Sequence, residues 1–144
     1  SDRRVINALP PELLTQVLDA LPVRIFWKDR ESRYVGCNKL FAADAGVDDP
    51  QEFVGKSDFY FYHPDQAKAF RDDDADVMYS GRAKLGIVEK IVHESGQVQW
   101  VETNKFPMRD AAGVVVGVIG MYQDVTVRVL ADEAKCRACA LVAA

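Results

Sequence analysis

The sequence predicts an α+β fold in which helices cover one face of a five-stranded antiparallel sheet. Two β-rich segments stand before a helical middle, and three more follow it. Turn residues at Ser95-Gly96 and at 110–113 separate the last three into a meander. Because a sheet buries its apolar face against a second layer, we expect the middle helices to cover that face.

An amphipathic flanking helix is predicted over residues 1–22. Pro10 and Pro11 suit the first turn of a helix, and Pro22 ends it. Apolar residues recur between them at helical spacing and form one stripe: Leu13, Leu14, Val17, Leu18 and Leu21. We expect the main domain to follow over residues 23–126.

The first half of that domain begins with a hairpin. β-branched and aromatic residues predict strands over 23–28 and 33–37, joined by a polar turn. Asn38 is a good N-cap for a short helix that stops at Gly46. Residues 48–62 are interpreted as short helical turns and loop.

The second half begins with a longer helix over residues 64–79, because Pro64 suits a first helical turn and Gly81 follows the last one. Strands are then predicted over 87–92, 98–106 and 114–123. After Thr126 apolar residues recur every three or four positions, at Val127, Leu130, Ala134, Ala138 and Leu141. Residues 127–144 are therefore expected to begin a helix that continues into a longer protein.

Composition excludes several classes of function. The 144 residues carry a net charge of −4 and no basic run, which argues against binding of nucleic acid. The longest apolar run, 114–122, is too short to span a membrane, and no signal peptide is visible. Three cysteines do not make a secreted disulfide scaffold, so a cytoplasmic location is predicted, whether or not the parent protein is membrane-anchored.

Catalytic and metal-binding patterns are scarce, so this segment is not expected to be an enzyme. Only His63 and His93 are present, without a nucleophile elbow. The aspartates at 72, 73, 74 and 76 lack the spacing of a calcium loop and are interpreted as a solvated helix face. Cys136 and Cys139 form a lone C-x-x-C pair, which is too few ligands for structural zinc, and their role stays open.

Several short strings stand out between residues 13 and 126: 26–30, 33–38, 96–103, 107–110, 113–118 and Asp124-Val125-Thr126, which is similar to D-[IV]-T. Together they resemble the PAS domain family, the sensory modules of bacterial signalling proteins. The resemblance implies a five-stranded sheet, helices over one face, a pocket between them and a signal helix after Thr126. It also implies a downstream effector domain in the same chain, with a histidine kinase favoured over a diguanylate cyclase or chemoreceptor.

The resemblance argues against both familiar chromophores of the family. The flavin-binding branch places a reactive cysteine in a segment that here reads Gly55-Lys56-Ser57-Asp58. Its polar flavin-reading positions match Ile91, Val101 and Tyr122, of which two are aliphatic. Haem-binding members carry a histidine in the long helix, where this chain has 69–71 without one. No cofactor is predicted, and an unknown small-molecule ligand remains open.

Strand alternation predicts which side chains face the pocket. The expected lining is Glu89, Ile91, Val101, Thr103, Lys105, Val118, Gly120 and Tyr122. A buried charge needs a partner, so Glu89, Lys105 and Tyr122 are expected to form the polar part of a ligand site. The alternative is that Glu89 and Lys105 pair across strands at the rim while aromatics fill the interior.

The opposite sheet face is expected to be apolar and to need a cover. It would carry Val88, Trp100, Glu102, Ile119 and Met121, and the stripe of Leu14, Val17, Leu18 and Leu21 would cover it in the same chain or in a partner. This predicts a parallel homodimer. A dimerisation module without ligand, for example in a diguanylate cyclase, is the rival interpretation.

Signal relay is predicted at the joint before the last helix. We expect Asp124 to bond a basic neighbour such as Lys105 or Arg128, and Thr126 to cap the outgoing helix.

Overall fold

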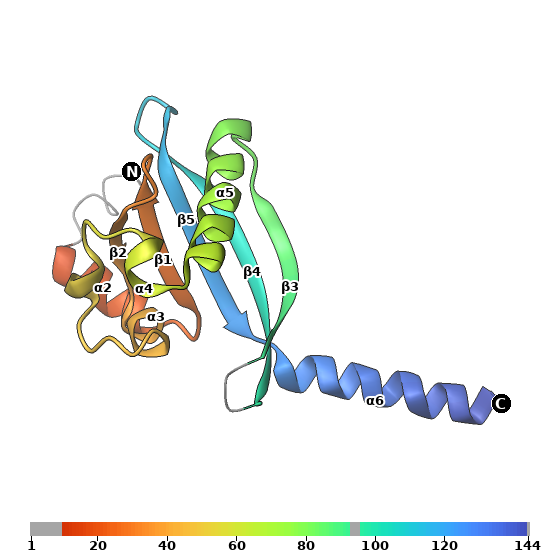
Figure 1. Cartoon of the computed structure of the whole chain (residues 1–144). Coiled ribbons are helices and arrows are strands. Elements are labelled where there is room, and N and C mark those ends of the chain that lie inside the picture. The colour runs from red at the N-terminus through yellow and green to blue at the C-terminus, as the bar shows by residue number, and fades with distance from the viewer. Residues whose placement is uncertain (1–9, 93–95, 144) are drawn as a thin grey trace, which may run out of the picture.

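The computed structural model describes residues 10–92 and 96–143, and in that part of the chain five strands form one antiparallel sheet (Figure 1). The strand order across the sheet is β2-β1-β5-β4-β3. Their bounds are β1 Arg24–Asp29, β2 Tyr34–Cys37, β3 Lys84–Val92, β4 Val98–Arg109 and β5 Val115–Asp124. The predicted α+β class with an antiparallel sheet is confirmed. His93 and Ser95 of the expected β3–β4 turn lie outside the described residues.

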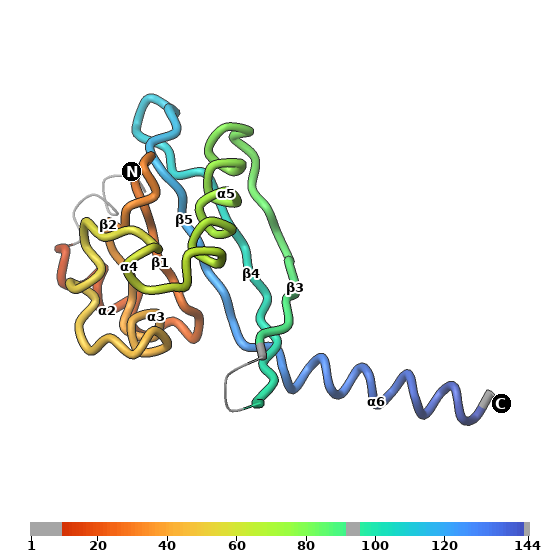
Figure 2. The backbone as a smooth tube through the Cα atoms, viewed as in Figure 1, coloured from red at the N-terminus to blue at the C-terminus, as the bar shows by residue number. Residues whose placement is uncertain are grey.

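Helices occupy one face of the sheet and both ends of the described chain (Figure 1). They are α2 Pro11–Ala20, α3 Lys39–Asp44, the 3₁₀ helix η1 Pro50–Phe53, α4 Asp58–Phe61, α5 Pro64–Ser80 and α6 Thr126–Ala143. The tube of Figure 2 shows α6 running away from the body of the domain beyond β5. The division into 1–22, 23–126 and 127–144 stays a prediction, and residues 1–9 lie outside the described part.

Strand β3 begins three residues earlier than the sequence predicts. Gly86 has a φ of 66°, a conformation that glycine adopts at little cost, and the register shifts between Lys84 and Ile87. The backbone N–H of Gly86 donates to Oδ1 of Asn104 at 2.8 Å. A bulge with its own hydrogen-bond partner thus lets pairing resume at Lys84.

The register of the central strands sets the inner face, which the helices cover. Phe26 of β1 lies opposite Gly120 of β5, and Thr103 of β4 lies opposite Tyr122. A Cβ at position 120 would clash with the Phe26 ring. Glycine is needed there because the large ring occupies the space above it.

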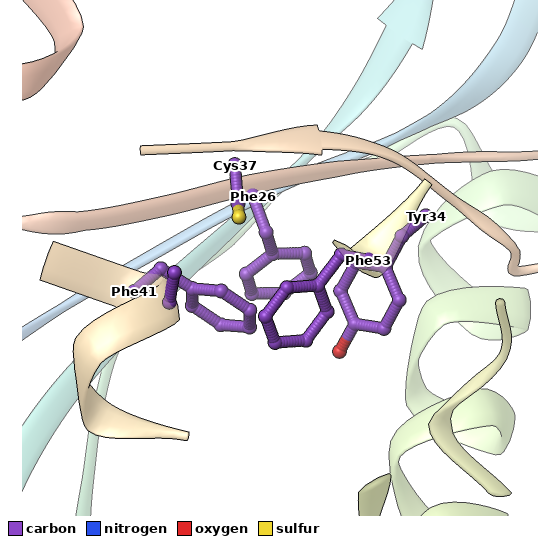
Figure 3. Packing of buried hydrophobic residues seen from close by; sticks show 6 residues of the cluster. Phe26, Tyr34, Cys37, Phe41 and Phe53 are labelled. Atoms are coloured by element: carbon purple, nitrogen blue, oxygen red, sulfur yellow. The ribbon is translucent and has the colours of Figure 1, made fainter. Parts of the chain in front are cut away.

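The main core is an aromatic cluster between the hairpin β1–β2 and the helices α3 and η1. Figure 3 shows Phe26, Tyr34, Phe41 and Phe53 pointing toward one another, and the Phe26 and Phe41 ring centroids are 5.0 Å apart. The aromatic cluster is defined here by its buried members Phe26, Tyr34, Cys37, Phe41, Ala42 and Phe53. A second, smaller cluster joins Val77 and Met78 of α5 to Val118 of β5.

Candidate functional site

A cavity of about 430 Å³ lies between the inner face of the sheet and the helices α3, α4 and α5. This volume is within the usual range for small-molecule pockets. Aromatic rings make much of its wall: Phe26, Tyr34, Phe41, Tyr62, Phe70 and Tyr122. The cavity therefore combines apolar surface with the polar groups described next.

A buried ion network forms part of the wall of this cavity. Lys28 Nζ lies 2.6 Å from Asp58 Oδ2 and 2.6 Å from Asp74 Oδ2. Lys105 Nζ lies 3.0 Å from Asp74 Oδ1 and 2.8 Å from Asp73 Oδ2. Asp74 bridges the two lysines and is fully buried, while the exposed fraction of Lys28 is only 1%. We call Lys28, Asp58, Asp73, Asp74 and Lys105 the buried ion network.

Aromatic groups surround the network. The Tyr34 hydroxyl donates to Asp58 Oδ1 at 2.6 Å, and Lys28 Nζ lies 4.8 Å from the centre of the Tyr34 ring and 5.0 Å from that of Phe26. Burial, together with the nearby charge of Asp58, raises the pKa of Tyr34 well above its usual value. Tyr34 therefore stays a neutral donor, and Lys28 is enclosed by opposite charge and by ring faces.

Lys105 and Asp73 of the buried ion network are stabilised in their charged forms by their partners. Burial acts to lower the pKa of Lys105, but the carboxylates of Asp74 and Asp73 outweigh it and the pKa is raised. Burial likewise acts to raise the pKa of Asp73, but hydrogen bonds from Lys105 and Lys84 lower it overall. Both groups are therefore ionised at neutral pH.

Six of the eight residues predicted to line the pocket do line the cavity: Glu89, Ile91, Val101, Thr103, Lys105 and Tyr122. The other two lie on the same face of β5 but outside the cavity wall. Val118 packs against Val77 and Met78, and Gly120 lies under the Phe26 ring. The ligand role of these residues stays a prediction.

The predicted alternative, a cross-strand pair between Glu89 and Lys105, is wrong. The register places Glu89 opposite Val101, and Lys105 bonds to aspartates of α5 instead. The Tyr122 hydroxyl donates to Asp44 Oδ2 at 2.9 Å. The three expected polar residues thus share one cavity, but each has a separate environment.

The sequence interpretation of the α5 aspartates as a solvated face is wrong for Asp74 and only partly right for Asp73. Asp72 and Asp76 are exposed, whereas Asp73 is partly buried and Asp74 is fully buried. Asp74 continues the buried stripe of Ala67, Val77 and Met78 at helical spacing. Helical spacing could have indicated that Asp74 is buried, and strand alternation from Phe26 could have placed Lys28 on the inner face. These two patterns were the signals in the sequence for the buried ion network.

The base of α6 is tied to β4 rather than to Lys105. The Asp124 carboxylate accepts from the Thr126 backbone N–H at 2.8 Å and from Gln99 Nε2 at 3.0 Å. The Thr126 hydroxyl accepts from the Trp100 N–H at 2.9 Å. Hydrogen bonds from Thr126 and then from Gln99 lower the pKa of Asp124. A broad depression of about 910 Å³ opens on the surface at this joint.

These bonds correct two expectations for the joint. Arg128 pairs with Glu102 at 2.6 Å and not with Asp124. Asp124, rather than Thr126, satisfies the first helical N–H, because α6 begins at Thr126 and this N–H is its own; the Thr126 hydroxyl accepts from Trp100 of β4 instead. The relay role of both residues stays a prediction.

The predicted cover of the outer sheet face is not seen within one copy of the described chain. Helix α2 has no buried residue, and Leu14, Val17 and Leu21 are exposed while Leu18 is half-buried. Its end is anchored at α3, where the Leu18 carbonyl accepts from Asn38 Nδ2 at 3.0 Å. The outer-face residues are half-buried, or exposed at Val88: Trp100, Glu102, Ile119, Met121 and Val88. Covering by a partner stays a prediction.

Metal and membrane features are few in residues 10–92 and 96–143. No group of three or more His, Cys, Asp or Glu side chains there is placed to hold a metal ion. Cys136 and Cys139 are exposed on α6 as free thiols. None of the described helices is long and apolar enough to cross a membrane.

Comparison with protein families identifies the fold. A family model described as the PAS fold matches residues 18–130, which is most of the chain. This chain belongs to the PAS family. The match includes the sheet, the cavity and the first turn of α6. The resemblance predicted from the sequence is confirmed.

Curated relatives of this PAS domain are signalling proteins. It is 30% identical over 115 residues to a diguanylate cyclase of Vibrio cholerae, covering 76% of this chain and 34% of that protein. It is 29% identical over 123 residues to the methanogenesis regulatory histidine kinase FilI of Methanothrix harundinacea, covering 83% and 13%. The PAS domain thus spans about a third or less of these relatives, and a signalling role is supported without a particular effector.

Solved structures share the fold of this PAS domain. The PAS domain of Bordetella pertussis BvgS has a TM-score of 0.68 at 21% identity, covering 87% of this chain and 96% of that one. A VqmA–ligand–DNA complex from Vibrio cholerae has a TM-score of 0.72 at 25% identity, covering 83% and 53%. VqmA bound to DPO has a TM-score of 0.69 at 23% identity, covering 80% and 58%.

Proposed function

We propose that this PAS domain is the sensory module of a longer signalling protein and that it binds a small molecule in the 430 Å³ cavity. Occupancy shifts the balance between two packing arrangements of the sheet and α6. Helix α6 passes this shift to an effector in the same chain, a histidine kinase or, as the alternative, a diguanylate cyclase. We also propose that the domain lies in the cytoplasm and forms a homodimer. The parent protein is either anchored to a membrane or free.

Strand β4 carries this proposal, because it contacts both the cavity and the start of α6. Val101, Thr103 and Lys105 line the cavity. The Trp100 backbone N–H donates to the Thr126 hydroxyl, and the Glu102 carboxylate pairs with Arg128 of α6. A shift of β4 along or across the sheet therefore reaches both sites.

Gln99 supplies a direct link between the two sites. It lines the cavity and also donates to Asp124 at the start of α6, at 3.0 Å. A ligand that contacts Gln99 competes with or reinforces this bond. The solved structure of VqmA bound to DPO supports the general idea, since a protein that contains this fold is described there with DPO bound.

A ligand screen combined with amide hydrogen exchange tests the proposal. We expect at least one compound from a metabolite library to raise the melting temperature and to change exchange in the first turn of α6 and in the 97–101 segment. Ile91→Trp at the cavity wall should abolish both effects, whereas Leu141→Trp on exposed α6 should keep them. Binding in the cavity without any change at α6 would contradict the relay.

The exposed apolar surfaces favour a second candidate, a dimerisation module without ligand. Val17 of α2 and Val127 of α6 are exposed, and so is Val88 of the outer sheet face. Such surfaces commonly mark protein contacts. This candidate predicts a concentration-dependent dimer in sedimentation and no response of the melting temperature to any compound.

A further inference from the structure

We propose that the cavity selects a small organic cation, a protonated amine or protonated nitrogen heterocycle attached to a flat apolar group, and that it discriminates against anions. This inference rests on the proposed function of the cavity as a ligand site. Three observations support it: the net charge of the lining, the pairing of both lysines with carboxylates, and the aromatic wall.

The charges that line the cavity do not balance. Two lysines, Lys28 and Lys105, face four carboxylates, Asp44, Asp58, Asp73 and Glu89, which leaves a net charge of −2. The charged residues that pair with this lining, and their own partners, do not change its net charge. Asp74 and Asp76 add two negative charges, and Arg24 and Lys84 add two positive ones.

Neither lysine of the lining is available to an anion. Lys28 Nζ contacts two carboxylates at 2.6 Å and is enclosed by the Phe26 and Tyr34 rings. Lys105 Nζ contacts Asp73 and Asp74, and the Lys105 side chain is buried. An incoming carboxylate near either ammonium would be repelled by the two carboxylates already paired with it, or would have to displace one of these ion pairs, which is costly away from water.

Acceptors, in contrast, remain available at the exposed side of the cavity. Glu89 is exposed, lines the cavity and has no ion pair within the described part of the chain. Asp44, also exposed, holds Arg24 and the Tyr122 hydroxyl, but each carboxylate oxygen accepts more than one hydrogen bond. A ligand cation near the mouth therefore meets surplus negative charge.

The aromatic wall adds a second source of preference for a cation. Phe41, Tyr62, Phe70 and Tyr122 line the same cavity as the exposed acids and the buried ion network. Burial, as the largest cause, raises the pKa of Tyr62 to about 12, so its ring stays neutral. Ring faces attract an organic cation and also pack against its flat apolar part.

Three probes of similar shape and different charge test this inference on the whole chain. They are 2-phenylethylammonium, 2-phenylethanol and 3-phenylpropanoate, and binding is measured by ligand-observed NMR titration at low and high salt. We expect the cation to bind about tenfold more tightly than the anion at low salt, a difference that one nearby unpaired carboxylate can supply. High salt should reduce the difference.

Matched variants locate the effect. Glu89→Gln should weaken binding of the cation severalfold and leave the neutral probe unchanged, while the same change at exposed Glu133 on α6 should alter neither. Ile91→Trp should abolish binding of all three probes. Tighter binding of the anion, or equal binding of all three, overturns the charge selectivity but leaves the ligand site standing. No binding by any probe overturns the cation selectivity, and a metabolite screen that also finds no compound overturns the ligand site.

Discussion

The aromatic cluster and the buried ion network lie against the same cavity and hold the fold in opposite ways. The aromatic cluster is apolar except for the Tyr34 hydroxyl, so its stability comes mainly from area removed from water and from ring packing. The ion network depends on all its members at once, because Asp74 neutralises both Lys28 and Lys105. Apolar packing therefore tolerates gradual change, whereas the network does not.

The largest expected effect comes from removing the shared member of the network. Asp74→Ala leaves two buried lysines short of a counter-charge, and breaking such a pair costs about 3–5 kcal/mol of unfolding free energy. Chemical denaturation measures this loss. Asp72→Ala on the exposed side of α5 is the control, and its stability should stay close to that of the wild type because its pair with Lys68 is exposed.

If the Asp74→Ala protein is too unstable to measure, the milder Asp74→Asn variant keeps the shape and still removes the charge. An Asp74 variant that is as stable as the Asp72 variant would show that the network does not hold the fold.

An intermediate effect is expected at the aromatic end, where Gly120 makes room for Phe26. Gly120→Ala forces the new Cβ into the Phe26 ring, and overpacking of this kind typically costs about 1–3 kcal/mol. Phe26→Leu in the same protein should recover part of that loss, since the smaller side chain vacates the space. A double-mutant cycle from denaturation curves measures the coupling, and additive effects would contradict the proposed clash.

The smallest expected effect is a pH dependence at the partly exposed edge of the network. Because the folded pKa of Asp73 lies below its usual 3.8, its pairing stabilises the fold above about that pH and is lost as the pH falls through the folded pKa. Solvent screens this pair, so its contribution is about 1 kcal/mol or less.

Unfolding curves of the wild type and of Asp73→Asn should differ at neutral pH and converge at acid pH, with Asp132→Asn on exposed α6 as the matched control. A difference that persists unchanged to acid pH would mean that the carboxylate charge is not its source.

The helices and strands were largely predictable because their signals are local. Caps such as Asn38, whose Oδ1 accepts from the Phe41 N–H, and breakers such as Gly81 act within a few residues. Alternation along β4 correctly placed Val101, Thr103 and Lys105 on one face. The early start of β3 was missed because a bulge at Gly86 depends on Asn104 of another strand.

The partners of the charged residues were not predictable in the same way. The sequence presented Lys105 with Glu89 and Asp124 as candidates, and the structure pairs it with Asp73 and Asp74. These aspartates are more than thirty positions away, on a helix whose distance from the sheet depends on side-chain packing. The distance between α5 and the sheet decides whether Lys105 reaches these aspartates.

The sequence by itself determined the family, the order of the elements and the face of the sheet on which most cavity residues lie, because periodicity, caps and turns are properties of neighbouring residues. Only the tertiary structure decided which aspartate is buried, which lysines it neutralises and how β4 joins the cavity to α6. Burial and pairing depend on the distance between segments that are remote in sequence. Coulomb energy and desolvation change steeply over that distance.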